Sequence, residues 1–134
     1  MNDCVFCKIL AGEIPSMKIY EDEYCIATLD IGPATDGHTL ILAKEHYSDV
    51  TEVPDECLGN LFAAAKKVGK IQMEKLGADG FNIVQNNGAA AGQTVRHFLI
   101  HVIPRYEGGP IVAAWKPAEP DFEKLGEIQQ KLLK

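Results

Sequence analysis

One long helical period in the middle of the chain restricts the fold more than any other feature of the sequence. Apolar side chains recur at helical spacing after Pro54, a residue that suits the first turn of a helix, and Gly77 is a typical stop signal. Strand-like segments with short connections stand on both sides of this helix. This order of elements favours an antiparallel α+β sheet with a single long helix.

The expected elements fill most of the chain. Strands are predicted at 17–21, 24–29, 38–42, 81–85 and 95–103, mostly separated by turn signals such as Asp36-Gly37 and Asn87-Gly88. Short helices are predicted at 4–11 and 121–134. The 134 residues, 46% apolar and 24% charged, predict one domain over 1–134, with the Pro- and Gly-rich region 108–134 as a looser tail.

The charge of the chain limits its partners. A net charge of -6 and a pI near 5.1 would repel a polyanion, so duplex nucleic acid and anionic membranes are not expected partners. A small nucleotide needs only a few donors and an apolar slot, so it is compatible with this charge. We find no apolar run long enough for a membrane span and no secretory signal, and we expect a cytoplasmic protein.

The predicted strand at 95–103 carries two histidines. The two-residue period of a strand places His97, Leu99 and His101 on one face and Phe98 and Ile100 on the other. A Gly- and amide-rich loop, 86–94, precedes this strand and offers neutral donors to phosphate oxygens. Two alternatives remain on this evidence: structural imidazoles in a sheet and an ordinary hairpin loop.

The segment from Gly92 to Arg105 resembles the signature of the histidine-triad (HIT) family, His-φ-His-φ-His-φ-φ. Other blocks agree in order with the family, including Leu29-Asp30-Ile31, Gly37-His38-Thr39-Leu40 and Lys44-Glu45-His46-Tyr47. The resemblance implies the HIT-like fold, a five-stranded antiparallel sheet with one long helix and short terminal helices, and a homodimer. It also implies hydrolysis or transfer of nucleotidyl groups from purine nucleoside phosphoramidates or dinucleoside polyphosphates, through a covalent nucleotidyl-histidine.

The chain departs from the signature at one position. By the match, His97 is the first triad residue and His101 the third, whereas the middle position, which attacks phosphorus in the family, is Leu99. Leucine has no lone pair and cannot form the covalent intermediate. We therefore expect nucleotide binding with very slow turnover. The alternative is a natural pseudoenzyme that acts as a nucleotide-sensing or interaction module.

The resemblance also assigns the nucleotide contacts. Asp30 is expected at the ribose hydroxyls, and His38 is expected to support the catalytic strand by hydrogen bonding. Asn86, Gln93 and Thr94 are expected at the phosphate together with His101. The apolar slot for the base is assigned to Phe6, Ile9, Ile31 and Leu40.

The four cysteines divide into two groups. Cys4 and Cys7 have the spacing of metal ligands, whereas Cys25 and Cys57 are most simply small buried side chains. Some bacterial HIT proteins complete a zinc site with histidines, which correspond here to His46 and His97. The prediction is a structural zinc ion on Cys4, Cys7, His46 and His97, and the alternative is a pair of reduced thiols under a short helix. The partner of Trp115 in the tail is left open.

Overall fold

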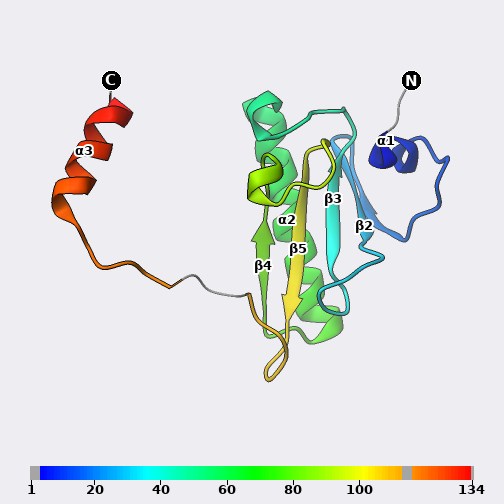
Figure 1. Cartoon of the computed structure of the whole chain (residues 1–134). Helices are drawn as coiled ribbons and strands as arrows, with labels where there is room; N and C mark the ends of the chain where they lie inside the picture. Colours follow the sequence, from blue (N-terminus) through cyan, green and yellow to red (C-terminus); the bar gives the residue numbers. More distant parts are fainter. Residues whose placement is uncertain (1–3, 113–115, 134) are drawn as a thin grey trace.

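In the computed structural model, which describes residues 4–112 and 116–133, five strands form one antiparallel sheet in the order β1-β2-β3-β5-β4 (Figure 1). The strands are β1 (Lys18–Glu21), β2 (Cys25–Leu29), β3 (Thr39–Ala43), β4 (Gly80–Val84) and β5 (Leu99–Arg105). The helices are α1 (Val5–Leu10), α2 (Asp55–Leu76) and α3 (Phe122–Leu133), and two 3-10 turns lie at Val50–Glu52 and Ala89–Ala91. The predicted fold class and the five-stranded antiparallel sheet are confirmed.

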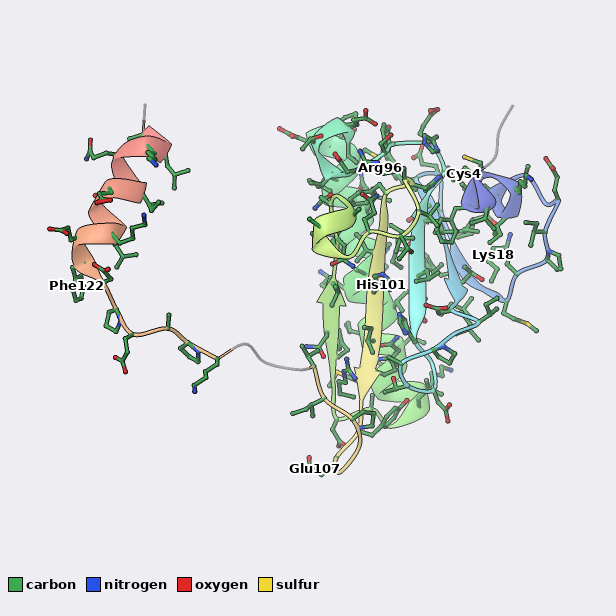
Figure 2. The ribbon with its side chains drawn as sticks, viewed as in Figure 1. Cys4, Lys18, Arg96, His101, Glu107 and Phe122 are labelled. Atoms are coloured by element: carbon green, nitrogen blue, oxygen red, sulfur yellow. The ribbon has the colours of Figure 1, made fainter. Side chains whose placement is uncertain are left out.

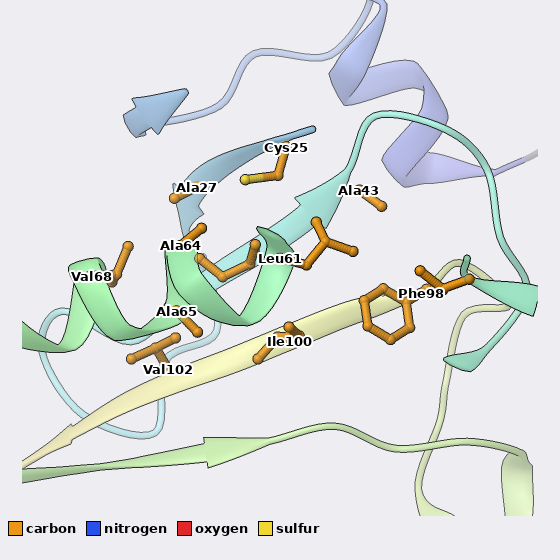
Figure 3. Close-up of a cluster of buried hydrophobic side chains, with 12 residues drawn as sticks. Cys25, Ala27, Ala43, Leu61, Ala64, Ala65, Val68, Phe98, Ile100 and Val102 are labelled. Carbon is orange, nitrogen blue, oxygen red and sulfur yellow. The ribbon is translucent and has the colours of Figure 1, made fainter. Parts of the chain in front are cut away.

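The long helix α2 covers one face of the sheet. It begins after Pro54 and ends at Gly77, whose φ of 69° is the left-handed conformation that glycine adopts easily. Its inward side chains, Leu61 and Val68 among them, are fully buried against the strands (Figure 3). This packing forms the main hydrophobic core, which consists of Cys25, Ala27, Ile41, Ala43, Val53, Leu61, Ala64, Ala65, Val68, Phe98, Ile100 and Val102.

The short helix α1 covers part of the opposite face. Its side chains Phe6, Ile9 and Leu10 pack on a smaller apolar cluster formed by Ile26, Leu40 and Leu42, which Leu99 also contacts. Since α1 has only six residues, it leaves the rest of this face uncovered.

Strand β5 begins at Leu99, four residues later than the predicted strand 95–103. The backbone N–H groups just before this strand donate to carbonyls outside the sheet ladder. The N–H of His97 donates to the carbonyl of Val95 at 2.8 Å, and the N–H of Phe98 donates to the carbonyl of Tyr47 at 2.6 Å. The expected alternation holds from Leu99 onward, because Ile100 lies in the core below α2 while Leu99 belongs to the opposite face. His97 therefore reaches the site from the loop and not from the strand.

The C-terminal helix α3 is amphipathic, and none of its residues is buried. Figure 1 shows that α3 covers neither face of the sheet. Trp115 lies outside the described residues. No helix in the described part of the chain is long and apolar enough to cross a membrane.

Candidate functional site

A cavity of about 220 Å³ opens on the sheet face that α1 leaves uncovered. Its floor is β5 beside β3, and its rim is the loop 86–95; Figure 2 shows His101 on β5 and Cys4 next to α1. Most of the predicted nucleotide contacts meet here. The lining residues are Phe6, Asp30, Leu40, Asn86, Gly92, Gln93, Thr94, Val95, His97, Leu99 and His101.

A chain of hydrogen bonds fixes the proton positions on two histidines. The N–H of Ala34 donates to His38 Nδ1 at 3.0 Å, so this nitrogen is unprotonated and neutral His38 carries its proton on Nε2. His38 Nε2 lies 3.0 Å from His101 Nδ1 and 3.5 Å from an Asp30 oxygen. The N–H of His38 therefore donates to His101, and neutral His101 carries its own proton on Nε2. The predicted support of β5 by His38 corresponds to this bond.

Burial keeps both imidazoles neutral at physiological pH. Desolvation lowers the pKa of His38 and that of His101, and the nearby Asp30 carboxylate opposes this effect only in part. The pair is thus a set of neutral hydrogen-bond donors and acceptors and not a source of positive charge.

Cys4, Cys7, His46 and His97 converge beside the cavity. Their four ligand atoms lie within 4.8 Å of one another. His97 Nδ1 is 3.3 Å from Cys4 Sγ and 3.1 Å from His46 Nδ1, and Cys7 Sγ is 3.2 Å from His46 Nδ1. The edges of a tetrahedral zinc site with two sulfur and two nitrogen ligands are about 3.3 to 3.8 Å long. The cluster therefore has close to the size that zinc requires.

The start of α1 and a hydrogen bond of His97 orient the ligand atoms of this cluster toward one another. Cys4 is the N-cap of α1, and its Sγ accepts from the N–H of Cys7 at 3.4 Å, so one helical turn places both sulfurs together. The buried His97 donates from Nε2 to the carbonyl of Ala43 at 3.1 Å, so neutral His97 has an unprotonated Nδ1 whose lone pair faces the cysteines. Desolvation also lowers the pKa of His97, which favours the neutral, ligating form.

The protonation pattern separates this cluster from a second one. Asp30, His38 and His101 also lie close enough to hold a cation. In that group, however, the Ala34 hydrogen bond keeps the proton on His38 Nε2, the nitrogen that faces the other two residues. A protonated nitrogen cannot ligate a metal, so this second group is a hydrogen-bond relay.

The loop 86–95 is stiffened by its own hydrogen bonds. The side chain of Gln93 accepts from the N–H of Gly88 at 2.8 Å and donates to the carbonyl of Ser48 at 2.6 Å. Arg96 donates to the same Gln93 oxygen at 3.0 Å. Gln93, which was predicted to bind phosphate, lines the cavity, and its amide also braces the loop against the segment after β3.

Two of the predicted base contacts do not line the cavity. Ile31 is 99% exposed, because the N–H of Gly32 donates to the Asp30 carboxylate and the chain turns away from the sheet at this point. Ile9, which belongs to α1, packs on the smaller apolar cluster and faces a neighbouring hollow. Phe6 and Leu40 remain as the apolar walls beside Asp30.

Comparison with known proteins identifies the family. The sequence pattern of the HIT domain matches residues 11–108. The chain belongs to the HIT family. An adenosine 5′-monophosphoramidase of Saccharomyces cerevisiae is 43% identical over 131 residues, which cover 97% of this chain and 80% of the yeast protein.

Two solved HIT-like structures extend the comparison. The protein SMU.412c of Streptococcus mutans superposes with a TM-score of 0.92 at 44% identity. The matched region covers 99% of this chain and 85% of the Streptococcus mutans chain. A zinc-bound histidine triad protein of Mycobacterium smegmatis superposes with a TM-score of 0.77 at 38% identity and covers 98% of both chains.

Within this HIT site, Leu99 lies on the cavity floor between His97 and His101 in the sequence. It pairs with Leu42 on β3, packs on the apolar cluster below α1 and lines the cavity. The floor of the cavity at Leu99 is therefore apolar and continuous with the wall formed by Leu40 and Phe6.

Proposed function

We propose that this HIT protein binds a purine nucleoside phosphoryl group in the cavity at β5 and barely turns it over, because Leu99 occupies the nucleophile position. The observation that carries the proposal is the cavity itself, in which a carboxylate, neutral donors and apolar side chains surround Leu99. The activity of the yeast relative supports an adenosine phosphoramidate as the bound compound.

Each part of the nucleotide has a partner of suitable chemistry. The Asp30 carboxylate accepts from ribose hydroxyls, and Phe6 and Leu40 flank the base. Asn86, Thr94 and the Nε2–H of His101 donate to the phosphoryl oxygens. His38 acts through His101, since its hydrogen bond holds that imidazole in the tautomer that donates into the cavity.

We propose that the cluster of Cys4, Cys7, His46 and His97 holds a structural zinc ion, supported by its size and by the zinc-bound relative. The ion would tie the start of α1 to the loop before β5. These residues would thereby hold Phe6 against the cavity.

The expected homodimer also belongs to this proposal. Leu61 is buried against the protein's own sheet, but Phe62 on α2 and Ile83 on the edge strand β4 remain 39% and 40% exposed. These side chains are available to a second copy.

Isothermal titration with AMP and GMP, combined with an adenosine phosphoramidate turnover assay, tests the proposed function. We expect saturable binding without measurable turnover and weaker binding by Asp30→Ala. Absence of nucleotide binding, or fast turnover by the protein with Leu99, would contradict the proposal.

The pseudoenzyme alternative shares the same binding site, and it is favoured by the one observation that the partly buried Leu99 packs on the apolar cluster below α1. A partner protein whose binding changes when the cavity is filled would support it over an impaired hydrolase.

A further inference from the structure

We infer that the cavity selects a singly charged phosphoryl group, as in a nucleoside phosphodiester or phosphoramidate, over the doubly charged terminal phosphate of a nucleoside monophosphate. This inference rests on the proposed function, because it concerns the charge of the group bound there. Four features of the cavity support it.

The first feature is the charge of the walls. Among the described residues that line the cavity, Asp30 is an acid and none is a lysine or arginine. Arg96 directly follows the lining residue Val95 in the sequence, but its side chain is 59% exposed and donates to Gln93 and Asp49. The lining therefore carries a net negative charge where an anion is to bind.

The second feature is the use of the loop amides. The backbone N–H groups of Ala91, Gly92 and Gln93 donate to carbonyls within the loop at 3.0 to 3.1 Å. The N–H of Gly88 donates to the Gln93 side chain. Since these four donors are already used, they do not form a nest of free amides of the kind that stabilises a dianion.

The third feature is the neutral state of His101. Its Nδ1 must accept from His38, whose own tautomer is fixed by the Ala34 N–H, so the relay works with an uncharged His101. The side chains on the walls that can donate to a phosphoryl group include the imidazole of His101, the amide of Asn86 and the hydroxyl of Thr94. All three are neutral, and neutral donors stabilise anions less than charged ones do.

The fourth feature is the position of the Asp30 carboxylate. One of its oxygens lies within 4.8 Å of a ring nitrogen of His101, the proposed phosphoryl donor. The second charge of a terminal phosphate would add repulsion from this carboxylate and a larger desolvation cost, and no lysine or arginine among the described lining residues offsets either.

The test is a titration series at pH 8 without divalent cations, using adenosine, adenosine 5′-(methyl phosphate) and AMP, which carry charges of zero, minus one and minus two there. We expect the methyl phosphate to bind about tenfold tighter than AMP, the ratio produced by about 1.4 kcal/mol of extra repulsion. AMP binding as tightly as the methyl phosphate, or more tightly, overturns the inference and leaves the proposed function intact. Failure of all three compounds to bind would instead overturn the proposed function.

A charge variant tests the cause. In Asp30→Asn the amide oxygen can still accept from the N–H of Gly32, which the carboxylate accepts at 2.8 Å, so the turn is kept. Loss of the ribose contact affects all three compounds equally, whereas loss of the charge favours AMP. We expect the ratio of the two affinities to fall several-fold in this variant and to stay unchanged in the control Asp36→Asn, an exposed acid outside the cavity. An unchanged ratio in Asp30→Asn contradicts the electrostatic explanation.

Discussion

Replacement of Gly69 by alanine tests the packing between α2 and the sheet that carries the site. Gly69 is buried in the middle of α2, and a Cβ there would overlap the ring of Phe81, with Cε2 only 2.7 Å away. Alanine gains about 1 kcal/mol of helix propensity over glycine, but overpacking a core costs about 1 to 3 kcal/mol. Because three ring atoms are involved, we expect the overlap to dominate and Gly69→Ala to lower the free energy of unfolding by about 1 to 2 kcal/mol.

The same helix offers a matched control. Gly59 is exposed, and a Cβ there meets nothing within 4 Å, so Gly59→Ala should raise the free energy of unfolding by about 0.5 to 1 kcal/mol. Urea denaturation of both variants measures the difference, and Phe81→Leu in the Gly69→Ala background should recover part of the loss. The packing argument is refuted if Gly69→Ala stabilises the protein as much as Gly59→Ala does.

Three further outcomes follow from the site. His46→Ala should purify with less zinc than the unchanged protein, for which elemental analysis should find about one ion per chain; equal contents would remove His46 from the metal site. Since burial lowers the pKa of His101, its NMR titration should have a midpoint below about 6.5, and because the unfolded chain then binds more protons, stability should fall as the pH drops below that value; a midpoint above it would contradict the buried relay. Light scattering should give the mass of a dimer, and a monomer mass at micromolar concentration would count against the homodimer.

Features set by local sequence were predictable. Pro54 and Gly77 bracket α2, and the two-residue period of β5 places Leu99 and Ile100 on opposite faces. The approach of Cys4 and Cys7 to His46 and His97, by contrast, was predicted from the resemblance, since the sequence alone gives only the spacing of the two cysteines.

Features set by tertiary hydrogen bonds were not predictable. Strand β5 begins late because Phe98 donates to Tyr47, and Gln93 braces its loop because it donates to Ser48; both acceptors are carbonyls more than 40 residues away in the sequence. Ile31 was predicted beside the base from the resemblance, and in the structure the turn that Asp30 makes with Gly32 leaves Ile31 in solvent. The sequence identified these residues as polar or apolar but contained no signal for their partners.

Adenosine phosphoramidate turnover by the Leu99→His variant tests the central claim most directly. An imidazole at this position would face the cavity beside His101. It could attack phosphorus and displace the amine, which forms a nucleotidyl-histidine that water then hydrolyses. Loss of a covalent nucleophile costs on the order of 10⁴ to 10⁶ in rate in other enzymes, so the variant should exceed the unchanged protein by about 10⁴ or more. Mass spectrometry of the variant should also detect the nucleotidyl adduct. Equal rates in a folded variant that still binds nucleotide would contradict the claim that Leu99 is what prevents turnover.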